Sequence, residues 1–80
     1  MSKTILLIDD DKSLLRVTEF NLSSAGFEVI AANSGRSGIE AFRKVNPDLV
    51  VTDVKLDDMS GLEVLEVIKK ESPETPVLVI

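Results

Sequence analysis

Short apolar runs alternate with longer amphipathic segments along the whole chain. Four of these runs have the length and the β-branched content of strands buried in a sheet, and they span residues 5–8, 27–32, 49–53 and 77–80. The three segments between them repeat apolar residues at helical spacing. This alternation predicts one α/β domain over residues 1–80, a doubly wound parallel sheet with right-handed crossovers and helices on both faces.

Each predicted helix has an apolar stripe that we expect to face the sheet. The first helix begins at a cap formed by Asp11 or Ser13 and ends at Gly26, and Ser34 is a plausible cap for the second. The expected inward residues are Leu14, Leu15, Thr18, Leu22 and Ala25 in the first helix, Ile39, Phe42 and Val45 in the second, and Leu62, Leu65 and Ile68 in the third.

Acidic residues gather directly after two of the predicted strands. Asp9, Asp10 and Asp11 follow the first run, Asp53 ends the third, and Asp57 and Asp58 come soon after it. In an open α/β sheet, ligands bind outside the carboxyl ends of the strands. If the first and third strands are neighbours, we expect at least Asp9, Asp10 and Asp53 to converge on one edge.

Such a convergence has an electrostatic consequence. Two carboxylates about 5 Å apart repel each other by roughly 3 kcal/mol at an effective dielectric constant near 20. A raised pKa or a bound cation relieves the repulsion, and an all-oxygen site suits a hard divalent ion such as Mg²⁺. Asp residues after strands also serve as caps and turn residues, and we interpret Asp11, Asp57 and Asp58 mainly in that way.

Composition narrows the chemistry further. The chain has no Cys and no His, which excludes a disulfide framework, a thiolate zinc site and the commonest general base. The net charge of −5 argues against general nucleic-acid binding, which needs a basic face. The run at 5–8 is too short for a signal peptide and no stretch is long enough to span a bilayer, so we expect a cytoplasmic protein without membrane contact.

Three motifs together carry a family resemblance. The segments Ile5–Asp11, Leu49–Asp53 and Met59–Glu63 resemble the receiver domain of two-component response regulators, and the likeness runs along all 80 residues. It implies a flavodoxin-like fold with strand order 2-1-3-4, a partial receiver domain that lacks the family's last helix-strand-helix portion.

The same resemblance implies roles for single residues. Asp53 would be the phosphoacceptor, attacking the phosphohistidine of a histidine kinase to form an aspartyl phosphate. Mg²⁺ would be held by Asp9, Asp10, Asp53 and the backbone carbonyl of Lys55. The protein would then be a signalling domain and no enzyme, apart from self-phosphorylation and self-dephosphorylation.

The chain departs from the family pattern in several places. Asp57 stands where receivers commonly have Pro, and Ser60 stands where they often have an acid. The family's later Ser or Thr and its Lys have no counterparts, so we expect impaired phosphotransfer. The fourth strand at 77–80 would be a bare apolar edge, and we expect it to drive self-association rather than a stable monomer.

Two other functions stay open on the sequence. Asp9 and Asp11 also form the D-x-D pattern of haloacid-dehalogenase-like phosphohydrolases, as nucleophile and general acid, although the further residues which that family needs are missing. Alternatively, the chain is a pseudo-receiver, an interaction or assembly module that is not phosphorylated.

Overall fold

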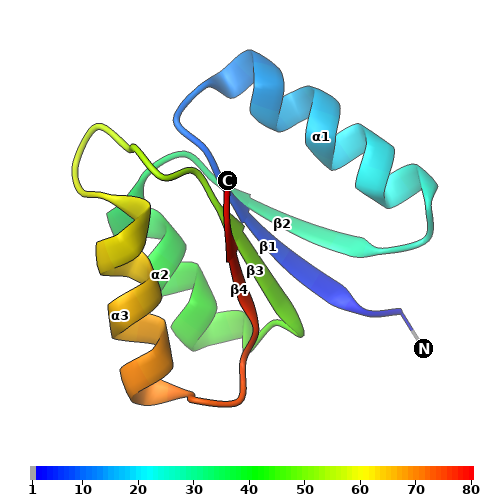
Figure 1. Ribbon diagram of the computed structural model, residues 1–80. Helices are drawn as coiled ribbons and strands as arrows, with labels where there is room; N and C mark the ends of the chain where they lie inside the picture. Colours follow the sequence, from blue (N-terminus) through cyan, green and yellow to red (C-terminus); the bar gives the residue numbers. More distant parts are fainter. Residues whose placement is uncertain (1) are drawn as a thin grey trace.

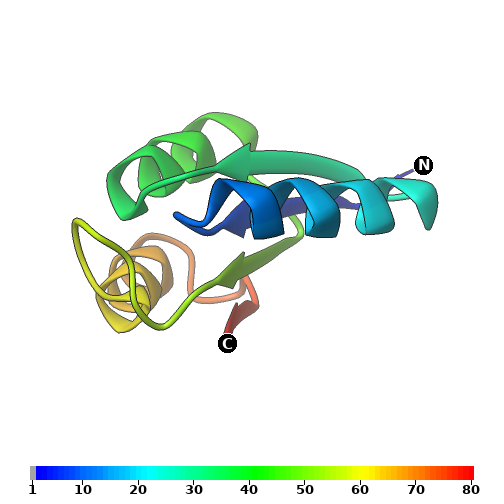
Figure 2. The same cartoon turned by 90° about the horizontal axis from the view of Figure 1, so that it is seen from above.

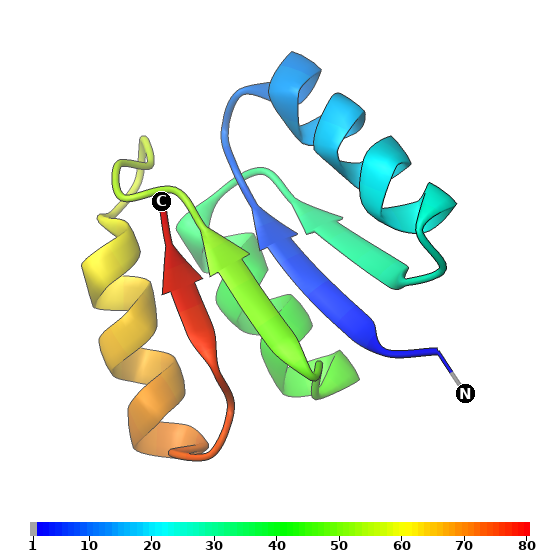
Figure 3. The ribbon, with the colours of Figure 1, turned by 45° about the vertical axis from the view of Figure 1, so that its right-hand side comes forward.

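The computed structural model describes residues 2–80, which form a single sheet of parallel strands. The strands are β1 (Thr4–Ile8), β2 (Glu28–Ala32), β3 (Leu49–Thr52) and β4 (Val77–Val79). Their order is β2-β1-β3-β4, which confirms the expected topology, and Figure 3 shows all four pointing the same way. β1 and β3 are therefore neighbours, and their carboxyl ends meet at one edge of the sheet.

Three helices cover the two faces of this sheet. They are α1 (Lys12–Ser24), α2 (Gly35–Val45) and α3 (Gly61–Glu71). α2 and α3 lie together on one face and α1 lies on the other (Figures 1 and 2). Within residues 2–80, no helix combines the length and the apolar content needed to cross a bilayer.

The main core lies between the sheet and the pair α2 and α3. β1 contributes alternate residues, Leu6 and Ile8, because successive side chains of a strand point to opposite faces. Val50 of β3 and Val64 and Ile68 of α3 are also fully buried. This packed layer gives β1 and β3 a rigid support up to the edge where they end.

α1 is held less tightly than its sequence pattern predicts. Of the five expected inward residues, only Leu15 is buried, whereas Leu14 is 51% exposed and Ala25 is also exposed. The expectation for Leu14 and Ala25 was wrong because α1 packs mainly on β1 and β2. The apolar stripe of α1 is wider than the surface of β1 and β2 on which it packs.

Two further inward assignments were wrong. Val45 is the last residue of α2 and is exposed, and Leu62 is 53% exposed while Val64 is fully buried. α3 begins at Gly61, and its buried positions are Gly61, Val64 and Ile68, so its buried face is rotated from the predicted one. Ile39 and Phe42 of α2 are buried as expected.

The predicted helix caps at Asp11 and Ser34 are confirmed. The Asp11 carboxylate accepts hydrogen bonds from the N–H groups of Ser13 and Leu14, both at 3.1 Å. The Ser34 hydroxyl accepts one from Ser37 N–H at 3.1 Å. α1 and α2 therefore start where the turn chemistry of the sequence places them.

Candidate functional site

Three carboxylates meet where β1 and β3 end. The register pairs Ile8 with Thr52, so the next residues, Asp9 and Asp53, leave neighbouring strands at the same level. Asp9, Asp10 and Asp53 each offer a carboxylate oxygen, and these oxygens all lie within 4.8 Å of one another. The expected convergence of these three residues is confirmed.

The backbone on both sides of this cluster is fixed by hydrogen bonds that continue the sheet. Asp53 N–H donates to the carbonyl of Ile8 at 3.1 Å, and Asp9 N–H donates to the carbonyl of Ala32 at 3.1 Å. The Asp9 side chain, only 6% exposed, accepts a hydrogen bond from Asp11 N–H at 2.9 Å. The acids are therefore held in place by the sheet and the first βα turn.

Burial and the crowding of like charges both raise the pKa of Asp53. Burial, a hydrogen bond that it can share with Asp9, and the negative charges of Asp9, Asp10 and Asp11 raise the pKa of Asp53 to about 6. Near neutral pH the Asp53 carboxylate is mostly ionised, but at an electrostatic disadvantage. A bound cation would remove that disadvantage.

The donor set fits a magnesium ion. All three side chains supply oxygen, the chain has no His or Cys to compete for a softer metal, and the oxygens are close enough to share one ion. Asp10 and Asp53 are half-buried, so one side of the cluster stays open to solvent. An open side leaves room for water and for a phosphoryl oxygen.

The neighbouring acids have different roles. Asp57 is exposed, and the negative charge of nearby Asp10 raises its pKa. Asp11 faces α1 instead, as its cap. The Asp11 carboxylate, which the phosphohydrolase alternative needs as a general acid, is therefore engaged in hydrogen bonds to Ser13 and Leu14.

The loop from β3 to α3 follows Asp53 directly and is fixed by contacts of its own. Leu56 is buried in the core, its N–H donates to the carbonyl of Met59 at 3.2 Å, and Gly61 N–H donates to the carbonyl of Val54 at 2.8 Å. Lys55 pairs with Ser60 in an isolated antiparallel bridge. This bridge fixes the start of the loop, whereas the metal-binding role of the Lys55 carbonyl stays a prediction.

Two residues of this loop have contacts that the sequence analysis missed. Asp58 accepts hydrogen bonds from the N–H groups of Gly35 and Arg36, both at 2.9 Å, and these bonds lower its pKa. Ser60 and Glu63 form a capping box at the start of α3. The S-x-x-E spacing predicts the capping box. No local pattern predicts the contact of Asp58 with α2, which joins residues more than twenty positions apart.

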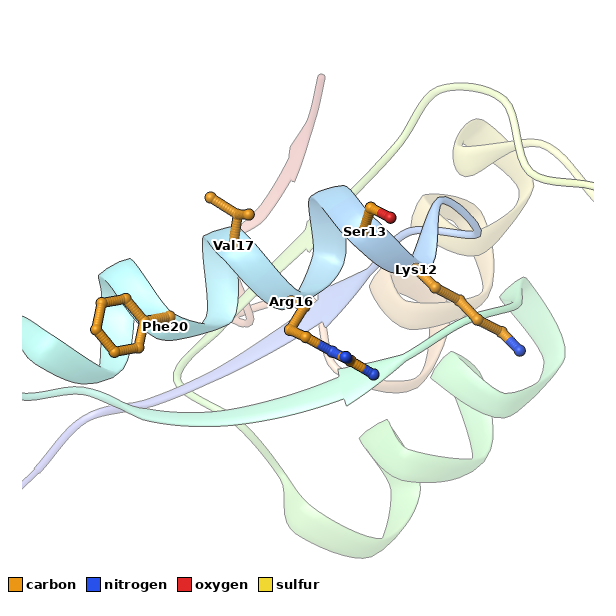
Figure 4. A pocket seen from close by; sticks show the side chains of 5 residues that line it. All are labelled: Lys12, Ser13, Arg16, Val17 and Phe20. Atoms are coloured by element: carbon orange, nitrogen blue, oxygen red, sulfur yellow. The ribbon is translucent and has the colours of Figure 1, made fainter.

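A shallow hollow runs along the exposed side of α1, which starts directly after the acidic turn. It is lined by Lys12, Ser13, Arg16, Val17 and Phe20 (Figure 4). Two of these residues are basic, and Phe20 is 70% exposed. A basic and apolar surface therefore begins two residues after Asp10 along the chain.

Comparison with known proteins agrees with the fold. A family model described as the response regulator receiver domain matches residues 5–80. The probable transcriptional regulatory protein TcrX of Mycobacterium tuberculosis is 42% identical over 77 residues, 96% of this chain and 33% of its own length. Curated relatives are longer, and in the Escherichia coli protein GlrR the matched part is 17% of the whole.

Solved structures of receiver domains have the same fold as this chain. A response regulator receiver domain protein from Clostridium thermocellum superposes with a TM-score of 0.94 at 35% identity, covering 96% of this chain and 63% of that chain. The response regulator TrrA of Thermotoga maritima, solved in complex with Mg(2+)-BeF, superposes with a TM-score of 0.87 at 30% identity, covering 96% and 65%.

Proposed function

Because the chain belongs to the response regulator receiver domain family, we propose that Asp53 accepts a phosphoryl group from a histidine kinase. Residues 1–80 act as one partial receiver domain in a two-component pathway, in the cytoplasm. The observation that carries this proposal is the meeting of the Asp9, Asp10 and Asp53 oxygens within 4.8 Å at the ends of β1 and β3.

The transfer uses the chain's own carboxylate as the nucleophile. An oxygen of ionised Asp53 attacks the phosphorus of the kinase's phosphohistidine, a P–O bond forms, and the P–N bond breaks. The imidazole nitrogen leaves with the electron pair and takes up a proton. The pKa of Asp53, about 6, keeps this carboxylate mostly ionised at pH 7 and above.

The residues that hold Mg²⁺ in this proposal are Asp9, Asp10, Asp53 and the carbonyl of Lys55. When bound, the ion supplies positive charge that offsets the carboxylates and the transferring phosphoryl oxygens. Asp9 and Asp10 would supply the negative charge that holds the ion, and Asp53 would also supply the attacking oxygen. The similar response regulator TrrA was solved in complex with Mg(2+)-BeF, which supports a magnesium site in this chain.

The α1 hollow offers a contact surface for the phosphodonor. Lys12 and Arg16 extend from α1 in a similar direction, and Phe20 lies further along the helix (Figure 4). In a chain with a net charge of −5, this basic and apolar strip on the helix that follows Asp9 and Asp10 suits an acidic or apolar partner face. We assign the kinase contact to it.

A second proposal concerns assembly. β4 pairs with β3 alone among the described residues, and on this outer strand Leu78 is 52% exposed. An exposed apolar edge pairs readily with another chain, so we propose self-association through β4. This property would also serve a pseudo-receiver that assembles without phosphorylation.

One experiment tests the phosphoacceptor role. The 80-residue chain is incubated with Mg²⁺ and acetyl phosphate, and intact mass is recorded against Asp53→Asn and the matched control Asp48→Asn. We expect one phosphoryl group on the unaltered chain and on the control, at a level that also measures the impairment expected above, and none on Asp53→Asn. Equal labelling of Asp53→Asn would refute the assignment, and Mg²⁺ binding without labelling would favour the assembly function.

A further inference from the structure

Asp58 connects the loop after β3 to a different helix. Its two carboxylate oxygens accept hydrogen bonds from Gly35 N–H and Arg36 N–H, the first two amides of α2, each at 2.9 Å. Such amides at a helix start have no partner within the helix, and they attract negative charge. The pair of bonds therefore ties residue 58 to the start of α2 from 22 and 23 positions away.

The start of α2 is a firm anchor for this contact. Ser34 caps the helix, its hydroxyl accepting the N–H of Ser37, and its carbonyl accepts the N–H of Gly38 at 2.9 Å. Asp58 supplies the two amide partners that Ser34 does not reach. Four successive amides of the first turn are thus bonded, two of them by the loop.

A packing contact supports the same connection. Met59 lies so close to Gly35 that a Cβ on this glycine would overlap its side chain. Met59 also packs against the main core, and its carbonyl accepts the N–H of Leu56. The loop tip is therefore held by polar and apolar contacts at adjacent residues.

The part of the loop that this contact holds is the part that borders the carboxylate cluster. Asp57, the residue before Asp58, lies near Asp10, whose charge raises its pKa. Lys55 lies two residues after Asp53. Without Asp58, the segment between Leu56 and Met59 would keep its own short turn and the packing of Met59, but it would lose its hydrogen bonds to α2. The position of its backbone and of Asp57 relative to Asp10 would then be free to vary.

We propose that Asp58 is a positioning residue: by bonding the N-terminus of α2, it holds the loop of residues 54–60 in the place where that loop completes the Mg²⁺ site. This inference rests on the proposed function, since it concerns the same metal site. Asp58 does not touch the ion in this account. It acts through the loop, as outer residues do when they orient the groups that bind a metal.

The test is a magnesium titration of the 80-residue chain, by calorimetry and by amide NMR. Asp58→Ala removes both hydrogen bonds, and Asp58→Asn keeps one acceptor oxygen. The matched control is Asp48→Ala, because Asp48 accepts a single backbone hydrogen bond, from Thr4 N–H at 2.8 Å, beyond the opposite end of the sheet. We expect Asp58→Ala to weaken Mg²⁺ binding about tenfold, with Asp58→Asn between it and the unaltered chain.

The control separates positioning from simple stabilisation. We expect Asp48→Ala to lower the unfolding midpoint without changing the Mg²⁺ dissociation constant. In the unaltered chain, the amide signals of Gly35 and Arg36 should shift during the titration together with those of Asp9 and Asp10. Asp58→Ala should abolish the shifts at Gly35 and Arg36.

The outcomes distinguish this inference from the function on which it rests. If the unaltered chain binds Mg²⁺ and both Asp58 variants bind it equally well, Asp58 is only a helix cap and the inference is overturned. If Asp58→Ala does not fold, the affinity of Asp58→Asn decides. If the unaltered chain binds no Mg²⁺ at all, the metal site of the proposed function is overturned together with the inference.

Discussion

The backbone carbonyl oxygen of Asp53 lies directly against Gly61, the first residue of α3, so closely that a Cβ at position 61 would overlap it. The N–H of Gly61 also donates to the carbonyl of Val54 at 2.8 Å. α3 therefore starts on the backbone of the proposed phosphoacceptor. The absence of a side chain at position 61 is what permits this approach.

This contact predicts the effect of Gly61→Ala. The added methyl group meets backbone atoms that cannot move without disturbing the end of β3, so we expect a loss of about 2 kcal/mol in the free energy of unfolding. Urea denaturation measures it. Leu62→Ala is the control, since that neighbouring side chain is half exposed and should matter much less. Equal losses for the two variants would contradict this account.

The carboxylate cluster could be predicted from the sequence because it depends on strand ends. Asp9 and Asp53 each follow an apolar run, and neighbouring parallel strands bring their ends together whatever the details of packing. The caps at Asp11 and Ser34 follow from equally local signals, whereas the strand order followed from the family resemblance. The bond from Asp58 to α2 joins segments more than twenty residues apart, and it depends on how the loop folds back.

Inward-facing helix residues were predicted less well, for a physical reason. Periodicity shows which residues share a stripe, but it does not show how much of that stripe the sheet covers. Leu14 lies on the apolar side of α1, but it lies beyond the area that β1 and β2 cover. In α3, both Leu62 and Val64 fit an apolar stripe, and the close packing of Gly61 against the end of β3 accompanies the burial of Val64.

The raised pKa of Asp53 predicts a pH-dependent stability difference. The folded chain holds this proton up to about pH 6, whereas the ordinary value is 3.8, so the folded state binds more protons between these values. The stability contributed by Asp53 is therefore full below about pH 4 and is lost as the pH rises through 6. Without Mg²⁺, we expect Asp53→Asn to be more stable than the unaltered chain at pH 7.5, by about 1 kcal/mol after allowance for solvent screening.

Thermal unfolding in EDTA at pH 4 and at pH 7.5 measures this difference. The advantage of Asp53→Asn should vanish at pH 4, where the unaltered side chain is also neutral. Asp48→Asn controls for the loss of one charge, and it should show no comparable gain at pH 7.5. A gain for Asp53→Asn that is equal at both pH values would contradict the electrostatic cause.

Magnesium should make the unaltered chain more stable than Asp53→Asn, the reverse of their order in EDTA. A ligand that binds only the folded state adds about 1.4 kcal/mol of stability at ten times its dissociation constant. Asp53→Asn and Asp10→Asn each remove one of the three clustered carboxylates, so both should gain much less. Unfolding midpoints recorded along a MgCl₂ series should therefore cross, and parallel curves for all three proteins would count against the metal site.

The Asp11 cap predicts different effects for two substitutions of one residue. α1 depends on this cap because Leu15 is its only buried side chain. Asp11→Ala removes the acceptor for Ser13 and Leu14 and should destabilise the chain by about 1 kcal/mol. Asp11→Asn keeps an acceptor oxygen and removes a charge that raises the pKa of Asp53, so it should be neutral or stabilising.

Hydrogen exchange resolves the two Asp11 variants. In Asp11→Ala, the amides of Ser13 and Leu14 should exchange faster than in the unaltered chain, while those of α3 should change little. In Asp11→Asn they should stay protected. Equal loss of protection in both variants would show that the charge at position 11, and not its acceptor oxygen, stabilises the start of α1.

The exposed β4 edge predicts self-association that one charge can prevent. Leu78 lies in the middle of β4, pairs with Val51 of β3 on one side, and is half exposed. A lysine there would carry its charge into any strand that added to this edge, which is how natural sheets discourage such pairing. We expect sedimentation velocity to show dimers or larger species for the unaltered chain at micromolar concentration, and a monomer for Leu78→Lys.

The control for this prediction is Phe20→Lys, which places a lysine on the exposed face of α1 instead. Phe20 is more exposed than Leu78, so a general reduction of surface hydrophobicity would act at least as strongly there. If β4 is the contact, Phe20→Lys should leave the association intact. Dissociation by Phe20→Lys but not by Leu78→Lys would move the interface to the α1 hollow, and a monomeric unaltered chain would refute self-association altogether.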